Sequence, residues 1–372
     1  MRTGIRRKFF LTITMVYVIG VTACSVSKDA QQKHSLKNAF QHDFLIGTAL
    51  DSSQIVESNK KVDLLIKKQF NAITAENVMK TAIIHPKADR YNFSLADKFV
   101  AYGKKHNMYL VGHTLIWHSQ LAPFVEKIAS PEALRAFMTA HIKTIAGRYA
   151  GSINAWDVVN EALNEDGSFR NSVFYQKLGE NYLTESFRIA QQAAPAAELY
   201  YNDYNIEQPA KRAGCIQLIK KIQSAGLRID GVGIQGHWLS GKVPLEAIEQ
   251  SILEYSALGI QVAITELDLE MLPRNFQGAD LEHKMKTDST QNPYTKGLPE
   301  NKEQQLAKDY EDLFRLFLKH KDKISRVTFW GVEDGQSWLN NWPMPGRTNY
   351  PLLFDRKLKP KAAYFRLLDL KN

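Results

Sequence analysis

The chain has 372 residues, of which 44% are hydrophobic and 23% are charged. This apolar content is enough for one large domain of α/β-barrel size or for two smaller domains. The formal net charge is +9, but four of the positive charges lie within the first eight residues, and the other basic residues are scattered along helical segments. The composition therefore excludes a clustered nucleic-acid-binding surface.

The N-terminus has the features of an export signal. Basic residues up to Lys8 precede an apolar run over 9–23, which is too short for a membrane span. The run ends in VTAC (21–24), which resembles the bacterial lipoprotein box whose cysteine is lipidated. We therefore expect a signal peptide over 1–23 and a lipid-anchored tether over 24–39, in an exported outer-membrane lipoprotein.

The chain has two cysteines, Cys24 and Cys215. With Cys24 as the lipidation site, the mature protein has no pair for an intramolecular disulfide, so its stability must come from the core. Cys215 falls in a helical pattern over 211–223 and is expected to be a small buried hydrophobe. The alternative for the N-terminus is ordinary secretory cleavage nearby, in which case Cys24 is incidental.

Residues 40–372 contain no internal repeat, low-complexity tract or proline-rich linker, which favours one domain. Helical patterns alternate there with apolar, strand-like runs. One helix is expected to begin at Ser130 and Pro131, and another to open with a capping box at Ser94. The strand-like runs are 44–50, 70–75, 109–115, 153–159, 198–201, 231–235, 261–265 and 326–330.

Eight strand–helix units predict a single-domain α/β fold, a (β/α)8 TIM barrel. A doubly wound open sheet is the competing arrangement. It is disfavoured because no expected strand is followed by a glycine-rich phosphate loop. In a barrel, the carboxyl ends of the strands converge on one face, where the chemistry is expected.

Polar and aromatic residues follow nearly every expected strand. A barrel rim is polar in any case, so only the combination is informative. Amides, carboxylates and histidines can bind sugar hydroxyls, while indole rings cover apolar sugar faces, so the combination indicates a carbohydrate ligand. In strand order, the residues are Glu76, Asn77 and Lys80; His113 and Trp117; Asn160 and Glu161; Asn202; Gln235 and His237; Glu266 and Asp268; and Trp330 and Trp338.

Six ordered stretches at these strand ends resemble the motifs of glycoside hydrolase family 10, the endo-β-1,4-xylanases. The likeness covers residues 40–370. One departure follows strand three, where the family usually places a tryptophan near a proline and this chain has Ala122, Pro123 and Phe124. The stretches are ITAENVMK (73–80), GHTLIWHSQ (112–120), WDVVNEA (156–162), GIQGHW (233–238), ITELDL (264–269) and WGVEDGQSW (330–338).

The resemblance implies retaining hydrolysis of internal β-1,4-xylosidic bonds in xylan, with Glu161 as general acid/base and Glu266 as nucleophile. It also implies that Asn160 binds the sugar 2-hydroxyl and that Asp268 orients His237 beside the nucleophile. The other implied substrate contacts are Glu76, Asn77, Lys80, His113, Trp117, Gln235, Trp330 and Trp338.

Two alternatives remain at this stage. A retaining β-glucanase could share the barrel, since a family likeness does not separate xylose from glucose. A non-catalytic glycan-binding lipoprotein is disfavoured because binding needs neither glutamate. No metal is expected, because the rim has no zinc-ligand spacing, and no cofactor, nucleic acid or second subunit is expected. The polar stretch 271–300 is expected to be a long loop at one end of the cleft.

Overall fold

The computed structural model describes Met1 and residues 35–274, 279–281, 284–286 and 288–371. The expected signal peptide beyond Met1, Cys24 and the tether up to residue 34 lie outside the described residues. Within them, none of the helices combines the length and apolar character needed to cross a membrane.

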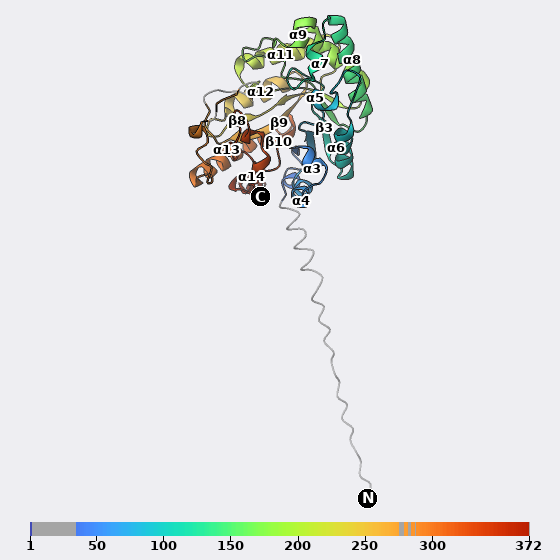
Figure 1. The fold of residues 1–372 in the computed structure, drawn as a ribbon. Coiled ribbons are helices and arrows are strands. Elements are labelled where there is room, and N and C mark those ends of the chain that lie inside the picture. The colour runs from blue at the N-terminus through green and yellow to red at the C-terminus, as the bar shows by residue number, and fades with distance from the viewer. Residues whose placement is uncertain (2–34, 275–278, 282–283, 287, 372) are drawn as a thin grey trace.

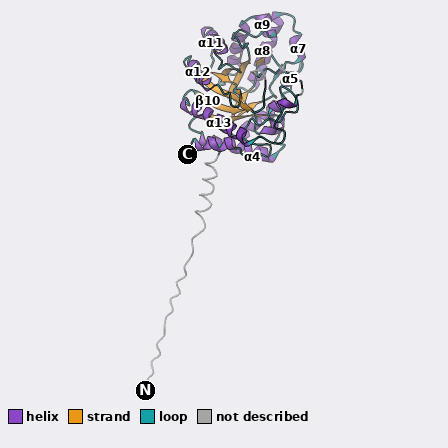
Figure 2. Ribbon diagram, turned by 90° about the vertical axis from the view of Figure 1, so that its left-hand side faces the viewer, coloured by secondary structure: helices purple, strands orange, loops and turns teal. Residues whose placement is uncertain are grey.

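Eight parallel strands form a closed barrel, as the sequence predicts (Figures 1 and 2). The order is β1, β2, β3, β5, β6, β7, β9 and β10, and β10 pairs with both β9 and β1 to close it. Two short strands, β4 (Ile116–Trp117) and β8 (His237–Leu239), pair with β5 and β9. The eight strands are β1 (Leu45–Leu50), β2 (Ala72–Ala75), β3 (Tyr109–Gly112), β5 (Ala155–Asn160), β6 (Glu198–Asp203), β7 (Gly231–Ile234), β9 (Gln261–Glu270) and β10 (Ile324–Phe329).

Helices surround the barrel (Figure 2). The longer ones are α4 (Lys60–Gln69), α6 (Ser94–Lys105), α8 (Pro131–Arg148), α10 (Asn181–Ala193), α11 (Pro209–Ser224), α12 (Leu245–Ser256), α13 (Glu300–Lys319) and α14 (Ala362–Asp369). The short ones are α2 (Leu36–Ala39), α3 (Ser52–Ile55), α5 (Thr81–Ile84), α7 (Pro123–Glu126) and α9 (Val173–Leu178), with 3-10 turns η1 (Ser289–Gln291), η2 (Asp334–Gln336) and η3 (Trp338–Asn340).

The strands are buried on both faces because helices cover the outside and side chains fill the inside. All six residues of β5 are buried. Val111, Ala155, Tyr200 and Ala263 form an apolar cluster of their own. Trp156 packs so closely against Gly112 that a Cβ there would lie 2.2 Å from the indole ring, which requires glycine at residue 112.

The two expected helix starts have different outcomes. Ser130 caps α8 by accepting a hydrogen bond from the Ala133 N–H at 3.2 Å, with Pro131 in the first turn, as predicted. The capping box at Ser94 was wrong. Ser94 is already the first helical residue of α6, and its N–H binds the Asn92 side chain at 3.3 Å.

Two boundaries also differ from the expected ones. Ser35 to Ala39, which the sequence places in the tether, lie against the domain, with Leu36 fully buried in α2. Strand β9 runs five residues past Thr265, because β8 supplies a parallel partner for its second half. Glu266 is therefore inside a strand. Cys215 is buried in α11, as expected.

Candidate active site

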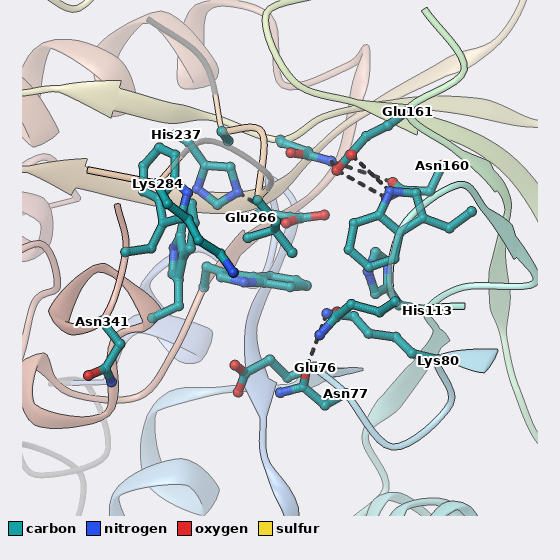
Figure 3. Close-up of a pocket in the computed structure, with 18 residues that line it drawn as sticks. Glu76, Asn77, Lys80, His113, Asn160, Glu161, His237, Glu266, Lys284 and Asn341 are labelled. Atoms are coloured by element: carbon teal, nitrogen blue, oxygen red, sulfur yellow. Dashed lines mark hydrogen bonds and ion pairs between the residues drawn. The ribbon is translucent and has the colours of Figure 1, made fainter. Parts of the chain in front are cut away.

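A pocket of about 410 Å³ opens at the carboxyl ends of the barrel strands. All twelve residues that the sequence assigns to catalysis or substrate binding line it, and Figure 3 shows Glu161 and Glu266 directed into the same space. Asp268 lies behind them. The pocket lining consists of Glu76, Asn77, Lys80, His113, Trp117, Gln120, Asn160, Glu161, Gln235, His237, Glu266, Ala279, Leu281, Lys284, Trp330, Trp338, Asn341 and Trp342.

Glu161 follows β5 in a left-handed backbone conformation, with φ of 55°. This conformation is uncommon for a residue with a side chain, and it ends the strand direction abruptly. The Glu161 N–H donates to the Asn202 carbonyl at 2.9 Å, which keeps this turn attached to β6. The backbone is therefore fixed where the side chain leaves the strand.

Three side chains donate hydrogen bonds to the Glu161 carboxyl group. The Trp117 indole Nε1 lies 2.8 Å from Oε2, and the Gln235 amide Nε2 lies 3.0 Å from Oε1. The Asn160 amide Nδ2 also approaches Oε1, at 3.2 Å. Glu161 is 7% exposed, so these donors replace water around most of the group.

Glu266 is held by a second set of donors. The Asn202 Nδ2 lies 2.8 Å from Oε1, and the His237 Nε2 lies 3.1 Å from Oε2. The other ring nitrogen of His237 lies 2.9 Å from Asp268 Oδ1, and Trp338 donates its indole N–H to Asp268 Oδ2 at 2.7 Å. Asp268 therefore orients His237, and Trp338 orients Asp268.

The charge on His237 follows from this arrangement. Burial disfavours the protonated ring, but the Asp268 and Glu266 carboxylates outweigh it and raise the pKa of His237 to about 10. At neutral pH the ring is an imidazolium, and both nitrogens donate. Glu266 consequently faces a positive charge on one oxygen and an amide donor on the other.

One amide connects the two carboxyl groups. Asn202 Nδ2 contacts both Asn160 Oδ1 and Glu266 Oε1, each at 2.8 Å, and Asn160 in turn contacts Glu161. Thr265 Oγ1 fixes this side-chain amide by donating to Asn202 Oδ1 at 2.6 Å. The sequence places Asn202 at a strand end but assigns it no role. Only the spatial neighbourhood of β5, β6 and β9 reveals one.

Lys80, Asn77 and Glu76 form the wall opposite the two glutamates (Figure 3). Lys80 Nζ lies 3.0 Å from Asn77 Oδ1 and 4.9 Å from the centre of the Trp117 ring. Burial lowers the pKa of Lys80, and Glu76 opposes this effect. Burial also raises the pKa of Glu76, against the influence of Lys80. The wall therefore offers both donors and acceptors for sugar hydroxyls.

His113 and the tryptophans complete the pocket. His113 Nδ1 lies 2.9 Å from the buried carboxylate of Asp157. Its ring meets Trp330 edge to face, with centroids 5.4 Å apart. Trp338 stacks on Trp342 with centroids 4.6 Å apart. Trp342 was not expected at the site, because it lies outside the motif that ends at Trp338.

The loops supply further residues that the sequence did not assign. Ala279, Leu281 and Lys284 from the stretch 271–300 line the pocket, in agreement with the expected position of this loop. Gln120, the last residue of the stretch 112–120, also reaches the pocket. Two residues later, in the segment that departs from the family pattern, buried Ala122 leads into α7, which begins at Pro123.

The two pocket histidines, His113 and His237, both form hydrogen bonds with carboxylates. Among the residues that the structure describes, one group of three side chains has spacing suited to a metal ion, namely Glu57, Asp63 and His106. It lies outside the pocket, and Lys105 and Lys67 already neutralise its two carboxylates.

Comparisons with known proteins agree with this geometry. The profile of Glycosyl hydrolase family 10 matches residues 35–370. An endo-1,4-beta-xylanase A from Xylanibacter ruminicola is 40% identical over 361 residues, which is 95% of this chain and 98% of the relative. The structure also resembles that of an endoxylanase of this family retrieved from sugarcane soil metagenome.

The superposition with that endoxylanase has a TM-score of 0.86. The two sequences are 45% identical, and the match covers 91% of this chain and 100% of the endoxylanase. A mutant relative solved in complex with xylotriose has a TM-score of 0.80 and 36% identity, over 90% of this chain and 99% of its own. With the profile covering nearly the whole barrel, the chain belongs to glycosyl hydrolase family 10.

Proposed function

We propose that this protein is an endo-1,4-β-xylanase that hydrolyses internal bonds of xylan with retention of anomeric configuration. The observation that carries the proposal is the single pocket in which Glu161 and Glu266 face one space and share a network of amides. The xylanase relative from Xylanibacter ruminicola and the xylotriose complex support xylan as the substrate class.

Glu266 is the nucleophile in this mechanism. Its carboxylate attacks the anomeric carbon while Glu161 gives its proton to the departing glycosidic oxygen, so the C–O bond breaks and a glycosyl ester forms. Protonated His237 and Asn202 each hold one oxygen of Glu266. They fix the direction of attack and leave the carboxylate no freedom to rotate away.

Glu161 then acts as the base. It removes a proton from water, which attacks the same anomeric carbon. The ester bond breaks, and Glu266 returns to a carboxylate. Two inversions give overall retention. The donors Trp117, Gln235 and Asn160 hold Glu161 in one position for both proton transfers.

The walls of the pocket bind the sugar that becomes covalently attached and the sugars beyond it. Asn77, Lys80 and Glu76 offer polar groups to hydroxyls, while the indole faces of Trp330 and Trp338 cover apolar sugar faces. Xylose lacks the hydroxymethyl group of glucose. The expected preference for xylan therefore depends on how closely these tryptophans approach the sugar ring.

Product analysis tests the proposal. Xylan and a mixed-linkage β-glucan are incubated separately with the purified chain, and the oligosaccharides are separated. We expect xylo-oligosaccharides of several lengths from early time points, with the β-anomer appearing first in proton NMR spectra. Faster cleavage of the glucan would favour the glucanase alternative, and initial appearance of the α-anomer would contradict the retaining mechanism.

We also propose that the protein is an exported lipoprotein anchored through Cys24 and active as a monomer. Helix α2 directly precedes β1, so the described chain enters at the amino ends of the strands, opposite the pocket. Figure 1 places this entry beside α4 and α14. An anchor on that side would leave the cleft facing away from an outer membrane.

Membrane fractionation tests the anchor. Cys24→Ala is expected to move the protein from the membrane fraction to the soluble fraction and to abolish labelling by radioactive palmitate. Cys215→Ala is the matched control, because it removes the only other cysteine, which is buried. Unchanged partitioning of the Cys24 variant would contradict lipidation at this residue.

A further inference from the structure

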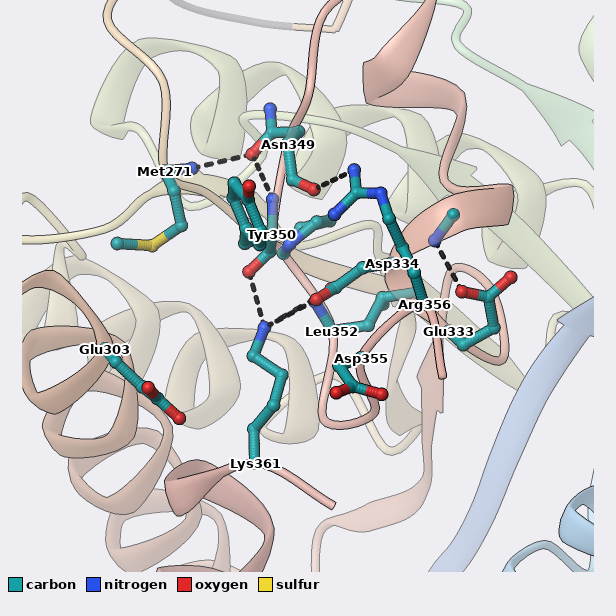
Figure 4. Close-up of polar contacts among 12 residues, drawn as sticks. Met271, Glu303, Glu333, Asp334, Asn349, Tyr350, Leu352, Asp355, Arg356 and Lys361 are labelled. Carbon is teal, nitrogen blue, oxygen red and sulfur yellow. Dashed lines mark hydrogen bonds and ion pairs between the residues drawn. The ribbon is translucent and has the colours of Figure 1, made fainter. Parts of the chain in front are cut away.

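Trp330 and Trp338 line one side of the pocket and are here called the tryptophan wall. A buried ion pair lies beside the segment that carries them. Lys361 Nζ is 3.0 Å from Asp334 Oδ2, and Asp334 is fully buried while Lys361 is 8% exposed (Figure 4). Burial raises the pKa of Asp334 and lowers that of Lys361, and each charge opposes the effect of burial on the other. Removing two charges from water is costly, so such a pair is weak evidence for stability alone.

The pair connects two stretches of chain through main-chain groups. Asp334 Oδ1 accepts the Leu352 N–H at 2.9 Å, and Lys361 Nζ donates to the Tyr350 carbonyl at 2.8 Å. The Asp334 N–H donates to the Phe354 carbonyl at 3.0 Å. The position of Asp334 is therefore fixed from several directions by the stretch 350–361.

From Asp334 the connection continues toward the pocket. Asn340 Nδ2 donates to the Asp334 carbonyl at 2.7 Å, across the segment that carries Trp338. Trp338 in turn donates to Asp268, which orients His237 beside Glu266. Asn340 and Trp338 belong to the same 3-10 turn, η3, and the other steps are hydrogen bonds. A shift of Asp334 would therefore be transmitted to Trp338 and then to the nucleophile.

We propose that Asp334 and Lys361 are positioning residues, and that their ion pair holds the segment 330–342 so that Trp338 supports the nucleophile and the bound sugar. This inference rests on the proposed xylanase function. The pair touches no substrate and acts only through the placement of Trp338 and Trp330, which flank Asp334 in the chain.

The decisive variant combines Asp334→Asn with Lys361→Met. It removes both charges together, so neither is left buried alone, and it keeps an oxygen that can accept the Leu352 N–H. Asn340→Ala is a second variant that leaves the ion pair in place. It removes a half-buried side chain that donates to the Asp334 and Gly335 carbonyls and accepts from the Asn349 N–H and from Arg356. Lys361→Arg keeps the positive charge. Lys308→Met is the matched control, because it breaks an exposed ion pair with Asp312 on α13.

Activity is measured on an aryl β-xylobioside, per folded molecule, at a temperature where circular dichroism matches that of the wild type. We expect kcat/KM of the double variant to fall about 10- to 100-fold, with KM raised and kcat lowered. We expect a smaller fall in kcat/KM for Asn340→Ala. The kcat/KM of Lys361→Arg should lie between those of the wild type and the double variant. Acrylamide quenching of tryptophan fluorescence should increase in the double variant and not in the Lys308 control.

A double variant or Asn340→Ala with kcat/KM within twofold of the wild type would overturn the inference, since a merely structural pair predicts unchanged activity per folded molecule. Unchanged quenching would also count against it. Wild-type protein that fails to hydrolyse xylan or the xylobioside would refute the proposed function instead. The quenching measurement would still report whether the ion pair holds the tryptophans.

Discussion

Asn202 donates a hydrogen bond to Glu266 across 2.8 Å, and Asn202 is fully buried in β6. The same amide nitrogen contacts Asn160, the neighbour of Glu161 in the chain. A single side chain from a third strand therefore links Glu266 on β9 to Asn160, which donates to Glu161 just after β5. Barrel closure brings these three strands together at the pocket.

Replacing Asn202 should test this link. Asn202→Ala removes the donor to Glu266 and leaves a gap between the two halves of the site, so we expect kcat on xylo-oligosaccharides to fall about 100-fold. KM should change less, because Asn202 does not line the pocket. Steady-state kinetics on xylotetraose measure both constants. A raised KM with unchanged kcat would contradict the assigned role.

Loss of the nucleophile should separate chemistry from binding. Glu266→Ala removes the attacking carboxylate, and we expect kcat to fall by a factor on the order of 10⁴ or more. The walls that bind sugar remain, so titration calorimetry should still detect binding of xylotriose. Substantial residual hydrolysis by the purified variant would exclude Glu266 as the nucleophile.

Loss of the acid/base should depend on the leaving group. Glu161→Ala should hydrolyse xylan very slowly, yet an aryl xylobioside with a good leaving group should still form the glycosyl ester, because its departure needs no proton. Azide can then enter the space left by the carboxylate and attack the ester. We expect azide to accelerate turnover and to yield a β-xylobiosyl azide detectable by mass spectrometry.

Failure of azide to accelerate the Glu161 variant, together with equal losses on both substrates, would indicate a structural role for Glu161. Glu76→Ala is a useful comparison, because it removes another pocket carboxyl group outside the proposed acid–base pair. Azide should not accelerate that variant.

The sequence predicts the barrel well because its strands are apolar runs bounded by turns, a local signal. The same signal failed at β9, where polar Glu266 and Asp268 look like the end of a strand. The strand continues because Asp268 to Glu270 pair with β8, residues 237–239, and sequence periodicity cannot predict this pairing. The actual strand end depends on a contact between segments far apart in the chain.

The same difference between local signals and long-range contacts separates the site residues that the sequence predicts from those that it misses. Glu161 and Glu266 stand out because each interrupts an apolar strand, and the family motifs supply their expected roles. Asn202 and Trp342 carry no such local mark. Asn202 matters because β6 lies between β5 and β7, and Trp342 matters because it stacks on Trp338. Only the folded chain shows these relationships.

The protonated state of His237 should appear in the pH dependence of stability. Its pKa is about 10 in the folded protein, above the ordinary value of 6.5 that applies to the unfolded chain. The folded state therefore holds one more proton between these values. This group should lower the free energy of unfolding by up to about 1.4 kcal/mol per pH unit as the pH rises from 6.5 toward 10.

Urea unfolding between pH 6 and pH 10 measures this contribution. His237→Asn should be less stable than the wild type at pH 6, and the difference should shrink as the pH rises. His42→Asn, at an exposed position, is the matched control and should follow the wild-type curve. Parallel curves for the wild type and the His237 variant would contradict the raised pKa.

Lys211 presents a second buried charge whose removal should be costly. It is fully buried, with Nζ 3.0 Å from Asp203 Oδ1 and 3.7 Å from the centre of the Tyr204 ring. Burial raises the pKa of Asp203 to about 6, although Lys211 acts against it. Lys211→Met leaves Asp203 without its cation, so we expect the free energy of unfolding at pH 7.5 to fall by about 3–5 kcal/mol.

The deficit should depend on pH in one direction. Without Lys211 the pKa of Asp203 rises further, so acidification protonates Asp203 in the folded variant and relieves the uncompensated charge. The stability difference from the wild type should therefore be smaller at pH 5 than at pH 7.5. Lys220→Met, on the exposed side of the same helix, should stay within about 0.5 kcal/mol of the wild type. An equal effect of both replacements would show that the ion pair with Asp203 contributes nothing to folding.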